Sequence, residues 1–210
     1  MESLKSLEWR YATKKFDNSK KLNEAQISIL KEAFNLTATS FGLQPIKLLV
    51  VSNQELKEQL VEHSYQQQQV ANCSHLLVIC IKTDIDADYV DQKFDLEKKI
   101  RGTSEEIIKD FRAYLKENVN GKTQEDLELS AKHQAYIALG NLMTVCAFEK
   151  IDSCPMEGFI PQKYDEILDL NSKNLKSVLL LPVGIRAEDD LLSNLKKVRI
   201  PVSESVIEIN

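Results

Sequence analysis

Three runs of consecutive apolar residues predict the strands of a central sheet. They are IKLLVVS (46–52), SHLLVICIKT (74–83) and SVLLLPVGI (177–185). The run at 74–83 is apolar at successive positions, which is typical of a strand covered on both faces. A fourth segment, SVIEI (205–209), alternates in character and predicts another strand at the C-terminal end.

The segments between these runs carry the signals of helices. Asn23 and Gln26 form a capping box, and apolar residues then recur at helical spacing. Further helices are predicted over 54–63, over a polar-rich stretch from 87 to about 118, from 123 onward, and briefly from 161. Because helices separate the strands, we expect an α+β or α/β sandwich around one central sheet.

Composition favours one domain spanning residues 1–210. The 210 residues are 43% hydrophobic and 28% charged, and no linker or repeat divides them. The net charge of −5 disfavours a nucleic-acid or anionic-membrane surface. Residues 1–16 lack the apolar core of a secretory signal, and the longest apolar runs are too short to cross a bilayer. We therefore expect a cytoplasmic protein with neither nucleic-acid nor membrane partners.

The sequence lacks the common signatures of side-chain and nucleotide chemistry. The four cysteines show no CxxC spacing, which indicates reduced, buried thiols, and the three histidines have no metal-ligand spacing. No GxGxxG, GxxxxGK[ST] or GxSxG motif occurs. If the protein is an enzyme, its reactive centre is expected to be a bound cofactor.

Two clusters of basic residues are candidates for binding an anion. Arg10 and Lys14 lie in WRYATKKF (9–16), and Lys197 and Arg199 lie in LKKVRIP (195–201). Residues two apart in an extended segment share a side, so Lys197 and Arg199 could hold one phosphate. The alternative is that these side chains are ordinary solvated cations.

Four strings in order resemble one family. RYATKKFD, TATSFGLQPIKLLVV, CPMEGF and LKKVRIP are similar to the FMN-dependent nitroreductases, close to the oxygen-insensitive NAD(P)H nitroreductase and dihydropteridine reductase branch. The resemblance implies a central, mostly antiparallel sheet flanked by helices, in an intertwined homodimer. It also implies tightly bound FMN at the subunit interface, with a C-terminal arm (about 200–210) reaching the partner.

The resemblance assigns cofactor contacts to particular residues. Arg10, Lys197 and Arg199 would hold the FMN phosphate, and Lys14 would lie near N1 and O2 of the flavin. In the bend that begins at Pro155 and Met156, the amides of Glu157 and Gly158 would point at N5 and O4. The remaining contacts implied are Tyr11, Ala12, Gln66 and Gln69, with Thr39, Ser40 and Gly42 supplied by the partner subunit.

Several positions depart from the family pattern. Ala12 lacks a hydroxyl that relatives often have, Gln66 stands where an asparagine is expected, and Gln69 replaces a lysine near the pyrimidine. The lost charge predicts a somewhat lower flavin potential than in relatives with both lysines. Phe41 is expected either to contact an aromatic substrate or to pack in the core.

The resemblance implies a ping-pong oxidoreductase in which no side chain need be catalytic. NAD(P)H would bind transiently and pass a hydride to flavin N5, and nitroaromatics, quinones or pteridines would then accept the electrons. These acceptors are small, planar and electron-poor. A non-catalytic flavin-binding redox sensor remains an alternative, with a deiodinase or flavin-destroying oxygenase as a third. The sequence leaves open the physiological acceptor and the choice between NADH and NADPH.

Overall fold

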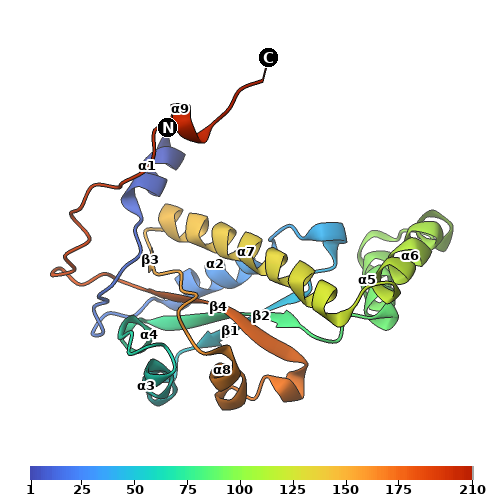
Figure 1. Ribbon diagram of the computed structural model, residues 1–210, viewed down its shortest axis with the longest axis horizontal. Helices are drawn as coiled ribbons and strands as arrows, with labels where there is room; N and C mark the ends of the chain where they lie inside the picture. Colours follow the sequence, from blue (N-terminus) through green and yellow to red (C-terminus); the bar gives the residue numbers. More distant parts are fainter. Residues whose placement is uncertain (210) are drawn as a thin grey trace.

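The computed structural model describes residues 1–209 as helices packed on both faces of one sheet (Figure 1). The helices are α1 (Glu2–Trp9), α2 (Glu24–Asn35), α3 (Gln54–Glu62), α4 (Gln69–Asn72), α5 (Ala87–Arg101), α6 (Glu105–Asn120), α7 (Gln124–Phe148), α8 (Pro161–Ile167) and α9 (Val202–Ser205), with 3-10 turns η1 (Ser40–Gly42) and η2 (Asn171–Lys173). The strands are β1 (Ile46–Val51), β2 (His75–Lys82), β3 (Asp152–Ser153) and β4 (Leu175–Gly184). Among the described residues, no helix has both the length and the apolar character needed to cross a membrane.

The sheet has the order β1-β2-β4-β3, and every neighbouring pair is antiparallel. The three strands predicted from apolar runs are confirmed, as is the α+β class with an antiparallel centre. The two-residue strand β3 was not predicted, because Asp152 and Ser153 give no apolar signal.

Alternate residues of the central strands feed two separate cores. From β2, Leu77, Ile79 and Ile81 join a core with α2, α5, α6 and α7, whereas Leu76, Val78 and Cys80 join a second core with α3 and α8. Figure 1 shows α2 and α7 on one side of the sheet and α3 and α8 on the other. The burial of β2 on both faces confirms the prediction from its continuous apolar run.

Helix starts largely follow the sequence signals. Asn23 and Gln26 form the predicted capping box of α2, and the Thr123 side chain caps α7. The predicted helix over 87–118 is in fact two helices. Gly102 adopts a left-handed conformation (φ 69°) that ends α5, a common use of glycine at a helix C-terminus.

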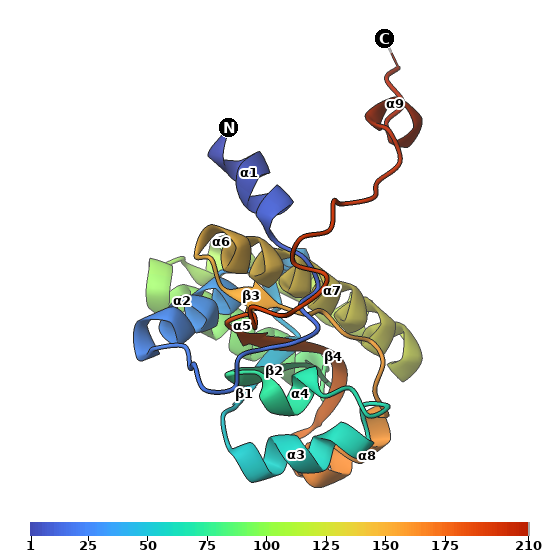
Figure 2. The same cartoon turned by 90° about the vertical axis from the view of Figure 1, so that its left-hand side faces the viewer.

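The strand predicted at 205–209 is wrong as a strand of the chain's own sheet. Ser205 ends α9, and residues 206–209 form no regular structure. Their apolar side chains are exposed: Val206 is 53% accessible, Ile207 87% and Ile209 94%. The segment projects from the body on the same side as α1 (Figure 2). Contacts within one chain therefore do not explain why apolar and polar residues alternate in it.

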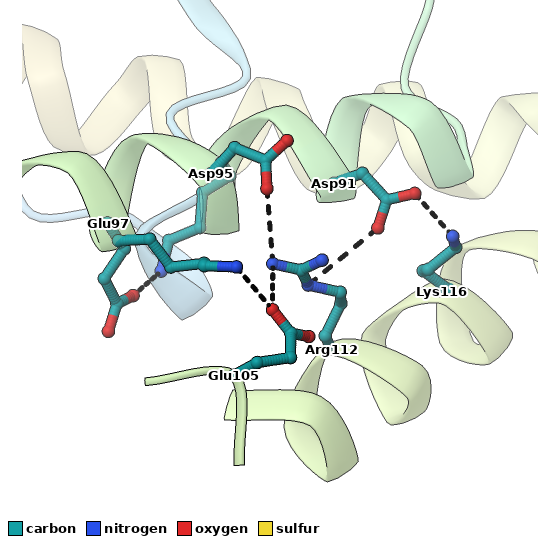
Figure 3. A network of polar contacts seen from close by, with 8 residues as sticks. Asp91, Asp95, Glu97, Glu105, Arg112 and Lys116 are labelled. Atoms are coloured by element: carbon teal, nitrogen blue, oxygen red, sulfur yellow. Dashed lines mark hydrogen bonds and ion pairs between the residues drawn. The ribbon is translucent and has the colours of Figure 1, made fainter. Parts of the chain in front are cut away.

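A network of charges joins α5 to α6 at the opposite end of the molecule from the termini (Figures 1 and 3). Arg112 of α6 lies 3.4 Å from Asp95, 3.4 Å from Glu105 and 3.9 Å from Asp91. Its guanidinium also stands 5.4 Å from the centre of the Phe94 ring. Arg112 therefore connects the two helices through both charge and cation–π contact.

Arg112→Ala is expected to loosen the α5–α6 pair by about 1 kcal/mol, because several partly buried charge contacts are lost together. Hydrogen exchange should then rise about fivefold in α5 and α6 and stay unchanged in β2 and β4. Arg101→Ala is the matched control, since the Arg101 side chain is 72% exposed and its one ion pair within residues 1–209 is with Glu97. Equal exchange in the Arg112 variant and wild type would contradict this role.

Candidate functional site

Residues 10–15 run along the β3 end of the sheet. Ala12 pairs with Ser153 in a parallel bridge, and the Thr13 amide donates to the Ser153 carbonyl at 3.2 Å. Just after β4, Arg186 donates to Asp152 at 2.6 Å. The segment is thus fixed beside β3 although it forms no strand of its own.

Asp190 fixes the same segment from the other side. It is only 4% exposed, and its carboxylate accepts from the Tyr11 hydroxyl (3.0 Å) and from the amides of Lys14 (2.9 Å), Lys15 (3.0 Å) and Leu192 (3.0 Å). Burial raises the pKa of Asp190, but the amide donors outweigh that effect and hold the pKa below its usual value. Burial and the bond to Asp190 raise the pKa of Tyr11 to about 12, so its hydroxyl remains a donor.

Three of the predicted cations converge on one pocket of about 290 Å³. Arg10, Lys197 and Arg199 line it together with Leu4, Leu7 and Glu8 of α1. The Lys197 ammonium donates to the Arg10 carbonyl. Burial, followed by the charges of Arg10 and Arg199, lowers the pKa of Lys197. Such mutual repulsion between cations is relieved by a bound anion.

The PMEG bend (155–158) lies between β3 and α8. Met156 pairs with Leu180 of β4, and the Glu157 carbonyl accepts from the Phe159 amide at 3.0 Å. The backbone amides of Glu157 and Gly158 donate no hydrogen bond to any acceptor within residues 1–209. The bend therefore presents two adjacent free donors.

Two groups of side chains surround this bend. The Lys14 ammonium lies 3.8 Å from the sulfur of Cys154, directly before Pro155. A Cβ added at Gly158 would lie 3.0 Å from the Gln67 amide nitrogen and 3.7 Å from the Tyr65 ring. Glycine thus permits a close approach that a larger residue would obstruct.

The two glutamines assigned to the cofactor are placed differently from each other. Gln66 is exposed and has a left-handed backbone (φ 61°). Gln69 is 6% exposed, and its amide donates to Gln67 at 3.0 Å. Gln69 therefore supports the bend's neighbour Gln67 through this contact.

The loop at 39–42 does not join the other predicted residues within one chain. Thr39 and Gly42 line a separate pocket of about 580 Å³ beside α5, which includes none of the residues 10–14, 155–158 or 197–199. The Ser40 amide donates to Gln134 of α7 at 2.8 Å. Phe41 is 46% exposed and meets Phe111 edge-on, so it is not a core residue.

Sequence reasoning missed residues that orient the site. Asp190 and Arg186 organise the segment at 10–15, and Gln67 and Tyr65 flank Gly158. Their partners lie far away along the chain (Asp190 is 176 positions from Lys14), so no local spacing could reveal them. The consecutive left-handed residues Tyr65 (φ 51°) and Gln66 are visible only in the backbone.

The four cysteines belong to the two buried cores. All four are buried and free, as predicted, and burial raises the pKa of Cys73 to about 11 and of Cys80 and Cys146 to about 12. Residues 1–209 contain no group of three or more side chains able to hold a metal. The cations of the pocket can bind an anion, and the free amides of the bend can donate to acceptor atoms of a ligand.

Comparison with known proteins identifies the family of this chain. The sequence model of the family described as "Nitroreductase family" matches residues 7–185 of this chain. A candidate NAD(P)H nitroreductase of Staphylococcus haemolyticus is 33% identical over 216 residues, covering 98% of this chain and 95% of the relative. YfkO of Bacillus subtilis, another candidate NAD(P)H nitroreductase, is 35% identical over 182 residues. The match covers 78% of this chain and 76% of YfkO.

Solved structures show the same fold at lower identity. A nitroreductase family protein of Streptococcus pneumoniae superposes with a TM-score of 0.83 at 22% identity, covering 98% of this chain and 99% of that one. A candidate nitroreductase of Exiguobacterium sibiricum, solved in complex with FMN, superposes with a TM-score of 0.81 at 19% identity. The match covers 98% of this chain and 96% of that one. The match over residues 7–185 and the relatives above 30% identity establish that this chain belongs to the nitroreductase family of oxidoreductases.

Proposed function

We propose that the protein is an FMN-dependent NAD(P)H oxidoreductase. The observation that carries the proposal is that the segment at 10–15 links a pocket of cations to the PMEG bend, because it begins at Arg10 in the pocket and its Lys14 ammonium lies 3.8 Å from the Cys154 sulfur. Arg10, Lys197 and Arg199 line the pocket, and the amides of Glu157 and Gly158 in the bend have no acceptor within residues 1–209. FMN has a dianionic phosphate and a ring edge rich in acceptors, and one relative in structure is a complex with FMN.

Each part of the site would then have a defined task. The three cations bind the phosphate, with the arginines offering planar forks and Lys197 a point charge. Lys14 offsets the negative charge that grows at the pyrimidine edge, and the two amides donate to N5 and O4. FMN held by these residues would supply the redox chemistry between NAD(P)H and planar nitroaromatic, quinone or pteridine acceptors, and we propose a ping-pong order for the two substrates.

A homodimer would complete this site. The loop at 39–42 lies apart from the other predicted contacts within one chain, so a second copy must supply it if it covers the cofactor. β1 is an edge strand of the sheet, and a hollow of about 480 Å³ beside it is lined by Phe34, Ile46 and Leu48. The exposed apolar residues of 206–209 fit such a surface on a partner.

The double variant Ile207→Asp/Ile209→Asp tests that arm. Burying one isoleucine contributes about 1.5–3 kcal/mol, so the dimer should dissociate more than about tenfold more readily and lose FMN with it. Analytical ultracentrifugation across protein concentrations measures the change. Glu208→Ala should behave as wild type. A variant that dimerises unchanged would show that the arm does not bind the partner.

Anaerobic addition of NADH or NADPH to the FMN-loaded protein tests the activity itself. Rapid bleaching of the flavin's long-wavelength band, reversed by a nitrofuran or menadione, supports the oxidoreductase. A flavin that binds but is not bleached by either nucleotide supports the redox sensor instead. A cytoplasmic location remains a prediction.

A further inference from the structure

The PMEG bend is held by side chains on two sides. The Gln67 amide donates to the Gly158 carbonyl at 2.8 Å, and the Gln67 oxygen accepts from the Gln69 amide at 3.0 Å. On the other side, the Tyr136 hydroxyl of α7 donates to the Glu157 carboxylate at 2.8 Å. The Gly158 carbonyl and the Glu157 carboxylate therefore each accept a hydrogen bond from a side chain outside the bend.

These contacts leave an asymmetric pattern of hydrogen bonding. The carbonyls of Glu157 and Gly158 both accept hydrogen bonds, from Phe159 and Gln67 respectively. Their amides have no acceptor within the described residues 1–209. Glu157 and Gly158 are thus held through their acceptors, and their two amides remain available to a ligand.

Glycine creates the need for such an anchor. Gly158 allows a close approach, but glycine has more conformational freedom than any other residue and must be held to keep its amide aimed. The bond from Gln67 restrains the peptide that follows Gly158. Gln69, 6% exposed, in turn restrains Gln67, and consecutive amide hydrogen bonds strengthen one another.

The turn that presents Gln67 is itself unusual. Tyr65 and Gln66 are consecutive non-glycine residues in the left-handed region, with φ of 51° and 61°. Amides of Gln66 and Gln67 donate to Val61 (3.1 Å) and Ser64 (3.1 Å), which holds this turn in place. Unfavourable backbone conformations of this kind persist where the surrounding structure requires them.

We infer that Gln67 and Gln69 are positioning residues, forming a relay of two side-chain amides that aims the Glu157 and Gly158 amides at the cofactor. Gln67 acts through Gly158, and Gln69 acts through Gln67. The inference rests on the proposed binding of FMN. It gives Gln69 a task in this chain other than direct contact with the flavin.

Gln67→Met tests the relay, because methionine keeps the length and volume but cannot donate. The amides stabilise charge that grows on reduction, so the variant should bind reduced FMN about tenfold more weakly relative to oxidised FMN. That ratio corresponds to a midpoint potential about 30 mV more negative. The ratio of FMN to riboflavin affinity should not change, since the phosphate end is untouched.

Two further variants isolate the relay. Gln69→Met should shift the potential in the same direction by a smaller amount, with no added shift in the Gln67→Met background. Gln68→Met is the matched control, because Gln68 is the exposed neighbour and its side chain makes no hydrogen bond within residues 1–209. It should leave the potential unchanged.

NMR relaxation of the cofactor-free protein provides a readout independent of flavin. Gln67→Met should increase the mobility of the Gly158 amide, whereas Gln68→Met should not. Unchanged Gly158 mobility, or weakened FMN binding with no shift in potential, would overturn the inference. If the wild type binds no FMN, the proposed function fails, and the Gly158 mobility still decides whether the relay holds the bend.

Discussion

Replacing Arg199 with alanine is expected to weaken FMN binding by roughly 10- to 100-fold and to leave riboflavin binding unchanged. Arg10 and Arg199 line the same pocket with Lys197, and burial followed by their charges lowers the pKa of Lys197. A charge-assisted hydrogen bond contributes about 1.5–3 kcal/mol, which gives this range of affinity. Arg10→Ala should have an effect of similar size.

The comparison of two ligands makes this measurement specific. FMN and riboflavin differ only in the phosphate, so fluorescence titration of both separates the phosphate end from the ring. Lys163→Ala is a suitable control, since Lys163 lies on α8 and pairs with Glu166 in solvent. An equal loss for both ligands would mean that the cations shape the protein rather than bind the phosphate.

Asp190→Ala is expected to lower the free energy of unfolding by about 3 kcal/mol and to abolish FMN binding. The carboxylate is buried and accepts four hydrogen bonds, and its removal leaves those donors without a partner. It also joins the segment at 10–15 to the chain leading to Lys197 and Arg199. Urea denaturation measures the stability, and Asp189→Asn is the control because Asp189 is mostly exposed.

The effect of Asp190 should depend on pH with a defined sign. Its pKa in the folded protein is lowered, so its stabilisation is complete above the unfolded value of about 3.9. The stabilisation is lost as pH falls through the lower folded pKa. The difference between wild type and Asp190→Asn should therefore be constant from pH 5 to 7 and shrink below about pH 4. A difference that already shrinks near pH 6 would contradict this assignment.

The sheet and most helices could be predicted because their signals are local. The apolar run at 74–83 reports burial on both faces, and Asn23 with Gln26 marks a helix start by hydrogen bonds within one turn. The break at Gly102 was missed because a single glycine inside a helical pattern also occurs in unbroken helices. The pattern at 206–209 was misread because alternation does not specify which chain provides the neighbouring strand.

The sequence could suggest which cations belong to the candidate site, but not the long-range contacts that hold the site in place. Resemblance assigned Arg10, Lys197 and Arg199 to one phosphate, and the structure places them around one pocket. The framework depends on contacts such as Asp190 to Lys14 and Gln67 to Gly158, 176 and 91 positions apart. Periodicity describes neighbours in sequence, so such pairs appear only once the chain is folded.

Titration of the purified, never-denatured protein with FMN tests the central claim most directly. We expect saturable binding of one FMN per chain, with quenched flavin fluorescence and weaker binding of riboflavin. A folded protein that stays colourless in excess FMN would contradict it, because the converging cations and the free amides of the bend would then have another purpose.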